Sequence, residues 1–224
     1  MIKWGLLHIT LCLLIISSCK KDNFETVNRA FGKSYVNVTV GSYNVYKVEE
    51  IVYNDFNNTV DTLRYTLKEL NESIFKDNLG RNSIRLERYK LNDKKQWAYL
   101  NTWFSTTDNF TMERVEENKR IVKLSLPLSD DAVWNINAYN SDNSITAYYD
   151  FIHKPYKLDT FLFDSAVAVK SETINSFIRQ RQYYEVYANK IGLVYKNIVY
   201  IDLDITGTQK RGYKIKQQLI QHVP

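Results

Sequence analysis

Hydrophobic and polar residues alternate along most of the chain from about Tyr43 onward. In residues 62–68, for example, Leu63, Tyr65 and Leu67 alternate with polar or charged neighbours. Successive side chains of a β-strand point to opposite faces, so this pattern predicts strands with one face on a core and the other in water. The same alternation occurs in residues 84–87, 97–103, 134–138, 145–151, 161–169, 191–205 and 213–219.

Turn-forming residues separate these segments at intervals of roughly 8–15 residues, which is typical of consecutive β-hairpins. We therefore expect an all-β fold. An antiparallel meander of this length closes as a curled sheet, a half-barrel or a barrel, with a β-sandwich as the second alternative. Only residues 171–182 are ambiguous, because Ile174, Phe177 and Ile178 have helical spacing and predict one short helix near residues 172–181.

The first residues form a secretory leader, with Lys3 followed by an apolar stretch too short to cross a bilayer. Its end, Ile16-Ser17-Ser18-Cys19, resembles the lipobox of bacterial lipoproteins. The resemblance implies cleavage between Ser18 and Cys19 and a diacylglycerol on the Cys19 thiol. A plain signal peptide and an uncleaved anchor are the alternatives. The expected organisation is a signal peptide at 1–18, a flexible tether at 19–38 and a single β domain at 39–224.

Lys20, Lys21 and Asp22 follow the cysteine, and the chain is rich in Tyr, Asn, Lys and Ile. This combination resembles lipoproteins of Bacteroidetes-type bacteria. Lys20 stands where an aspartate would imply retention in the inner membrane, so the resemblance implies the outer membrane and leaves the leaflet open. Residues 187–196 contain Tyr-Ala-x-x-Ile-Gly-Leu-Val, which is similar to a segment of many uncharacterised exported β-proteins of this group.

Composition narrows the function further. The formal net charge is +5, or +4 without the leader, and basic residues are spread along the chain rather than clustered. Nucleic-acid binding, which needs a concentrated basic face, is therefore not expected. The chain has 2 cysteines, of which Cys12 is lost with the leader and Cys19 takes the lipid. The domain must then fold without a disulfide, and its length suffices for one hydrophobic core.

Candidate chemistry is sparse. His153 and His222 have no neighbours at metal-ligand spacing, and the sequence has no nucleophile elbow, free thiol or glycine-rich phosphate loop. We therefore expect neither a cofactor nor catalysis. The best acidic pair is Asp202 and Asp204, whose carboxylates would share one face of a strand and bind a cation or share a proton. The alternative we favour is the solvated face of that strand.

Aromatic residues are more suggestive. Trp97, Trp103 and Trp134 lie on predicted strands, where each packs in the core or lines a site for an apolar small ligand. The segments Asp61-Thr62-Leu63 and Asp164-Ser165-Ala166 resemble O-glycosylation acceptors of Bacteroidetes, which would place glycans on Thr62 and Ser165. Ordinary strand residues are the alternative that we favour for both.

These observations predict an outer-membrane lipoprotein, bound to the membrane through the lipid on Cys19. Its β domain would act as a non-catalytic binding or accessory module for a protein partner in the envelope or a small apolar ligand. One alternative is a half-barrel carrier of acyl chains, similar to the lipoprotein-localisation factors. An enzyme with an unrecognised site is the third.

Overall fold

The computed structural model of the protein describes residues 31–224. The expected signal peptide 1–18, Cys19 and residues 19–30 of the expected tether lie outside the described residues. The ordered elements are a 3-10 helix η1 (Lys33–Tyr35) and the strands β1 (Tyr43–Asn54), β2 (Thr59–Lys76), β3 (Asn82–Leu91), β4 (Trp97–Thr107), β5 (Thr111–Glu116), β6 (Lys119–Ser125), β7 (Val133–Asn135), β8 (Thr146–Leu158), β9 (Phe161–Ser171), β10 (Ile174–Asn175), β11 (Arg179–Ala188), β12 (Gly192–Leu203) and β13 (Gln209–Val223).

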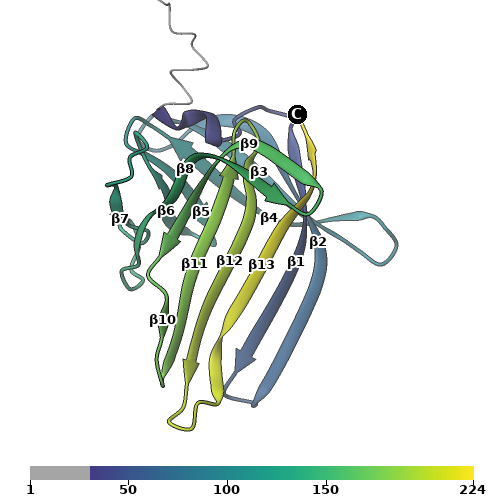
Figure 1. Ribbon diagram of the computed structural model, residues 1–224. Helices are drawn as coiled ribbons and strands as arrows, with labels where there is room; N and C mark the ends of the chain where they lie inside the picture. The colour runs from purple at the N-terminus through teal and green to yellow at the C-terminus, as the bar shows by residue number, and fades with distance from the viewer. Residues whose placement is uncertain (1–30) are drawn as a thin grey trace, which may run out of the picture.

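A single antiparallel sheet contains these strands in the order β6-β5-β4-β3-β2-β1-β13-β12-β11-β9-β8-β7, with β10 paired to β11. The sheet curls into a barrel shape (Figure 1). Its two ends meet where the backbone N–H of Val122 donates to the carbonyl of Ile136 (2.9 Å) and where Arg120 and Tyr139 form an isolated bridge. The barrel is therefore nearly closed. The predicted all-β antiparallel fold is confirmed, and the sandwich alternative is wrong.

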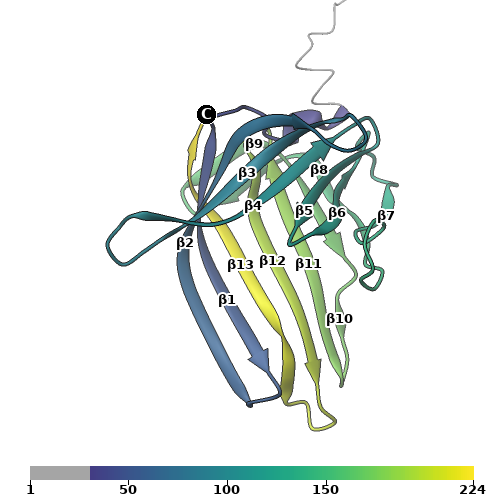
Figure 2. The ribbon, with the colours of Figure 1, turned by 180° about the vertical axis from the view of Figure 1, so that it is seen from behind.

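Five neighbouring strands, β2, β1, β13, β12 and β11, extend beyond the rest of the barrel and continue as a curved sheet at one end (Figure 2). The turns at this end carry large apolar side chains in water. Phe56, Phe177 and Ile205 are 100%, 88% and 93% exposed. The chain enters at the opposite end, where η1 and the C-terminus also lie (Figure 1).

The expected helix near residues 172–181 is wrong, because β10 and the start of β11 occupy this segment and residues 33–224 contain no α-helix. Ile174, Phe177 and Ile178 are all exposed, so no core stabilises a helical arrangement of them. Within the same residues, no helix is long and apolar enough to span a membrane.

Residues 31–38 of the expected tether belong to the folded domain. Tyr35 in η1 is 0% exposed and packs with Leu126, Tyr149 and Val167 in a buried cluster inside the barrel. Its hydroxyl contacts the hydroxyl of Ser165 at 2.7 Å. The η1 segment thus closes one end of the barrel, and the domain begins no later than residue 31 rather than at 39.

The hairpin formed by β8 and β9 folds over the outside of the barrel, across β12, β13 and β1 (Figure 1). Leu158 and Phe163 from this hairpin share a second buried cluster with Val186 and Val194. At the hairpin tip, Asp159 forms an ion pair with Lys47 of β1 at 2.9 Å. The hairpin therefore shields part of the outer sheet face from water.

Candidate functional site

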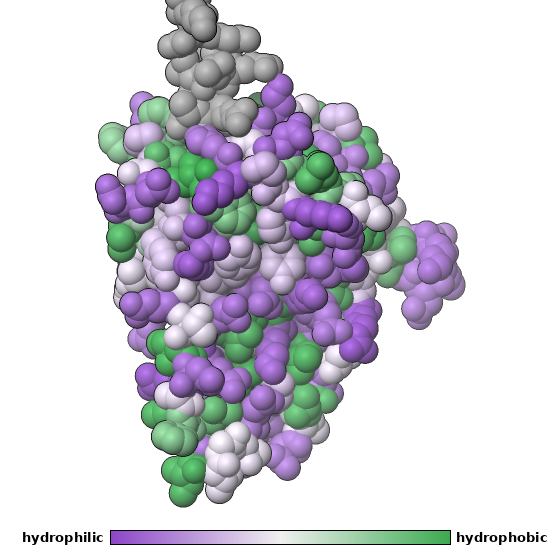
Figure 3. Space-filling model, viewed as in Figure 1, coloured by the Kyte–Doolittle hydropathy of each residue, from purple (hydrophilic) through white to green (hydrophobic). Residues whose placement is uncertain are grey.

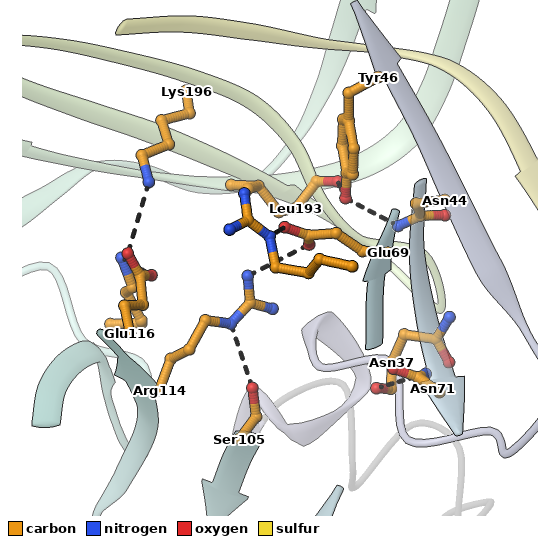
Figure 4. Close-up of polar contacts among 12 residues, drawn as sticks. Asn37, Asn44, Tyr46, Glu69, Asn71, Ser105, Arg114, Glu116, Leu193 and Lys196 are labelled. Carbon is orange, nitrogen blue, oxygen red and sulfur yellow. Dashed lines mark hydrogen bonds and ion pairs between the residues drawn. The ribbon is translucent and has the colours of Figure 1, made fainter. Parts of the chain in front are cut away.

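Charged side chains fill the middle of the barrel, and one group of them surrounds Glu69 of β2. Glu69 lies directly opposite Arg88 in the register of β2 and β3, and their side chains pair at 3.1 Å. Arg114 of β5 approaches the other carboxylate oxygen at 3.4 Å and donates from Nε to Ser105 Oγ at 3.1 Å (Figure 4). Because strand alternation directs these positions inward, the pairs lie inside the wall.

A second group surrounds Glu185 of β11, which is 0% exposed. Tyr183 and Tyr187, two residues before and after it on the same face, each donate a hydroxyl hydrogen bond of 2.5 Å to Glu185 Oε2. Lys123 of β6 pairs with Glu185 Oε1 at 3.1 Å. This arrangement satisfies both carboxylate oxygens from two facing parts of the barrel wall.

Glu116 extends the second group toward Arg114, whose charge lowers the pKa of its carboxyl. Its carboxylate lies 2.8 Å from Lys123 Nζ and 3.7 Å from Lys196 Nζ (Figure 4). Lys196, which faces Glu185 across β11 and β12, also lies 3.8 Å from the Glu185 carboxylate. The interior therefore holds two neighbouring charged groups, in which Glu69, Glu116 and Glu185 each contact at least one cation. We call them together the interior network.

This network fixes the protonation states of its members. Burial acts to raise the pKa of Glu116, but Lys123, Lys196 and Arg114 outweigh it and hold that pKa well below its usual range. Burial also opposes ionisation of Glu185, and Lys123 and Lys196 again lower its pKa.

Burial and the neighbouring Glu185 raise the pKa of Tyr183 and of Tyr187 well above the ordinary value. These two tyrosines are therefore protonated donors, and Glu116 and Glu185 are carboxylates. A general acid or base works best with a pKa near the operating pH, and none of these four groups has one.

Beside this network lies a cavity of about 30 Å³. Its polar lining includes Asn44, Tyr46, Glu69, Ser105 and Arg114. The Tyr46 hydroxyl is already engaged, because it donates to the carbonyl of Leu193 at 3.0 Å and accepts from Asn44 Nδ2 at 3.1 Å (Figure 4). The volume suits one or two water molecules, far below the roughly 300–1,000 Å³ of small-molecule pockets.

The three predicted tryptophans do not meet in one site. Trp134 packs on Tyr149 with ring centroids 4.9 Å apart and donates to the carbonyl of Val122 at 3.2 Å, so it belongs to the core and the barrel closure. Trp103 lies under the Arg88 guanidinium, 3.5 Å from its ring centroid. Trp97 is 38% exposed, with Lys68 Nζ 5.1 Å from its ring.

The acidic pair is also separated. Asp202 pairs with Arg181 and Arg211, and these arginines are the first causes of its lowered pKa. Asp204 instead accepts backbone hydrogen bonds from Thr206 at 2.8 Å and Thr208 at 3.0 Å in the β12–β13 turn. The two carboxylates therefore have different partners and do not share a proton.

The two histidines have different hydrogen-bond partners. His153 Nδ1 lies 2.5 Å from the Tyr35 hydroxyl, and His222 Nδ1 lies 2.7 Å from Asn44 Oδ1. Residues 31–224 contain no group of three or more His, Cys, Asp or Glu side chains placed to hold a metal ion.

The two proposed glycosylation residues differ in exposure. Ser165 is 3% exposed and its hydroxyl contacts Tyr35, so the folded domain does not present it to a modifying enzyme. We therefore withdraw Ser165 as a candidate for the folded protein. Thr62 is exposed on β2, and its glycosylation stays a prediction.

The sequence analysis did not predict the charged interior, although the sequence contains one pattern that indicates part of it. Glu185 lies two positions from both Tyr183 and Tyr187 on one strand, so the sequence places it on their face. Strand alternation does not predict the inward position of Lys196. A β-bulge between Val186 and Tyr187 shifts the pairing with β12 and turns Lys196 inward.

A larger hollow lies on the outer face of β13, β1 and β2. It is an open groove of about 440 Å³ whose lining includes Lys47, Glu49, Arg64, Lys216 and Gln218. We call it the outer groove. Figure 3 views this side of the molecule, where hydrophilic side chains gather over the middle of these strands.

No protein-family model and no curated protein matches this chain. Two solved structures align with it. One is a "putative lipoprotein" from Parabacteroides distasonis ATCC 8503, with 11% identity and a TM-score of 0.44. The other is a "putative exported protein with YmcC-like fold" from Bacteroides fragilis NCTC 9343, with 8% identity and a TM-score of 0.46. Each alignment covers 84% of this chain and 98% of the other.

Proposed function

We propose that the protein is a lipid-anchored component of the bacterial cell envelope, held at the outer membrane through Cys19. In this proposal its β-barrel domain is a non-catalytic binding or accessory module. The lipobox at Ile16-Ser17-Ser18-Cys19 supports the anchor, and the single barrel of residues 31–224 supports a compact exported module.

The observation that carries the binding role is the filled interior of the barrel. Glu69, Glu116 and Glu185 are neutralised there by cations, and the remaining cavity is about 30 Å³. A ligand entering this space would have to break buried ion pairs, which costs several kcal/mol for each charge left without a partner. Binding is therefore assigned to the outer surface, where the outer groove offers about 440 Å³.

The carrier alternative has less support. An acyl-chain carrier needs an apolar concavity that its own side chains leave unfilled. The described interior instead offers charged residues and room for one or two waters. The enzyme alternative would need a reactive group free to take part in chemistry, whereas the interior carboxylates and tyrosines are bonded to one another.

Mass spectrometry of protein extracted from membranes tests this proposal. Under denaturing conditions, the mature chain should begin at Cys19 and carry the mass of a diacylglycerol. A Cys19→Ala variant should lose this form, whereas Cys12→Ala, which changes a cysteine inside the leader, should retain it. A mature, membrane-bound Cys19→Ala protein would contradict the anchor.

Native mass spectrometry of the same samples separates the binding module from the carrier. We expect no non-covalent acyl chain on the folded domain, because the interior has no room for one. A stoichiometric fatty acid that survives extraction would favour the carrier alternative instead.

A further inference from the structure

The outer groove is basic, and the strand register explains how its cations come together. Lys216 of β13 and Arg64 of β2 both lie opposite Glu49 of β1, so the three side chains form one row across the outer face. Lys47 lies two positions from Glu49 on the same face of β1. Three cations therefore surround a hollow that contains one carboxylate.

The anions near the groove do not balance this charge. Glu49 pairs with Arg64 at 2.6 Å, and Asp159 of the β8–β9 hairpin pairs with Lys47 at 2.9 Å. Lys216 has no ion-pair partner among residues 31–224. Both pairs are largely exposed to water, where such pairs contribute little and exchange readily. An incoming anion can therefore compete for these cations.

Two further lysines extend the basic surface. Lys214 lies two positions from Lys216 on β13, with its ammonium 5.7 Å from the ring of Tyr53. Lys68 is on the outer face of β2, with its ammonium 4.6 Å from the ring of Tyr89. The outer face of β13, β1 and β2 thus presents five cations, counting Lys47, Arg64 and Lys216.

We propose that the outer groove binds the phosphate groups of anionic lipids in the membrane that anchors the protein. This inference rests on the proposed function. A guanidinium matches phosphate with two parallel hydrogen bonds, and an ammonium adds a compact positive charge. Arg64 and Lys216, which face each other across Glu49, supply one of each.

The length of chain between the anchor and the domain permits this contact. Roughly ten residues separate Cys19 from Phe31, and an extended chain of this length reaches at most about 35 Å. Lys216 lies about 25 Å along β13 from the end at which the chain enters, given the rise of a strand. The domain can therefore lie on its side with the outer groove against the headgroups.

Vesicle partitioning tests the inference. The full chain carrying Cys19→Ala, which removes the lipid site, is mixed with vesicles of phosphatidylcholine or of phosphatidylcholine with equimolar phosphatidylglycerol. Binding to the neutral vesicles gives the apolar contribution of the leader, and Lys3, Lys20 and Lys21 contribute equally to the anionic excess of every variant compared. We expect stronger binding to the anionic vesicles. The excess should vanish at about 1 M salt, where the screening length falls to about 3 Å.

The matched variants locate the effect. Lys216→Gln should lower the anionic excess about fivefold, and Arg64→Gln with Lys216→Gln about thirtyfold. Lys94→Gln removes one exposed charge from the β3–β4 hairpin, which projects from the barrel (Figure 3), and should leave the excess unchanged. Circular dichroism and urea unfolding should show that each variant keeps the fold, because these side chains are outside the core.

Three results would overturn the inference: no excess on anionic vesicles, equal loss with Lys94→Gln, or no loss with the double variant. Displacement by soluble glycerol phosphate at matched phosphate concentration would also overturn it, by showing a site for a free phosphate ester. The mass-spectrometric test of Cys19 is independent of all these results, so failure of the anchor and failure of the groove are distinguishable.

Discussion

Gly212 occupies a position that only glycine fits. It lies on β13 opposite Ile201 of β12, with a φ of +123°, a backbone conformation that other residues rarely adopt. A Cβ atom at this position would come within 1.9 Å of the Tyr200 carbonyl oxygen. This close approach of the backbones lies within the pairing of β12 with β13.

We therefore predict that Gly212→Ala lowers the free energy of unfolding by about 2–3 kcal/mol, measured by urea denaturation. Gly80→Ala is the matched control. Gly80 also has a positive φ, but a Cβ there would meet nothing within 4 Å. Gly80→Ala therefore costs only the backbone strain of an alanine at positive φ. Equal losses for the two variants would show that the close approach to Tyr200 is unimportant.

Residue-level prediction from the sequence succeeded where alternation was undisturbed. Ile84 and Leu86 are buried, as their pattern indicates, and Trp134 packs against the core. It failed where side chains bond to other side chains far away in the sequence. The partner of Glu185 is Lys123, 62 residues away, and no local pattern encodes that pairing.

At the level of elements, the β8–β9 hairpin is the part that leaves the barrel wall. Irregular pairing at three points along β8 bends the hairpin outward. Phe163 is the large side chain that it buries against the outer sheet face, together with Leu158. The hairpin is thus held to the barrel chiefly by apolar contact, with one exposed ion pair at its tip.

Replacing Phe163 with alanine should cost about 3–5 kcal/mol of stability, because a buried aromatic side chain leaves a cavity behind. The neighbouring Leu162 points to water, so Leu162→Ala should change stability by less than about 0.5 kcal/mol. Urea unfolding of both variants measures the difference. A small loss for Phe163→Ala would mean that the hairpin is only loosely attached.

The element boundaries show why one prediction failed. Residues 172–181 have apolar residues at helical spacing, but helix spacing stabilises a helix only when a core receives the apolar face. In the barrel, this segment lies at the far end of the long strands, where Ile174 is 46% and Phe177 88% exposed. Backbone pairing of β10 with β11 decides the structure there instead.

For the whole molecule, alternation and turn spacing were enough to predict an antiparallel all-β fold. They could not decide between a barrel and a sandwich, because closure depends on contacts between distant segments. β1 pairs with β13, and the end strand β6 meets residues 136–139. The sequence also could not predict that Tyr35 packs inside the barrel, because this too depends on distant segments. Its neighbours in the sequence are polar, which is typical of a tether.

The charges inside the barrel also affect the chain before it folds. Lys123 interrupts the apolar run Ile121 to Leu126, and Glu185 divides a segment of tyrosine and valine. Short uncharged segments of high β-propensity are the ones that associate between chains, and a charge within them opposes this. The side chains that form the network in the folded barrel therefore act in the unfolded chain as protection against aggregation.

Lys123→Met alone should cost about 3–5 kcal/mol, because it leaves buried carboxylates short of a cation. Adding Glu185→Gln should recover part of this loss while keeping an acceptor for Tyr183 and Tyr187. On dilution from urea, however, the double variant should scatter more light than wild-type protein at equal concentration. If the double variant refolds with no more light scattering than wild-type protein, these charges stabilise only the folded barrel. Otherwise the same lysine and glutamate that fill the barrel also keep the newly made chain soluble long enough to reach it.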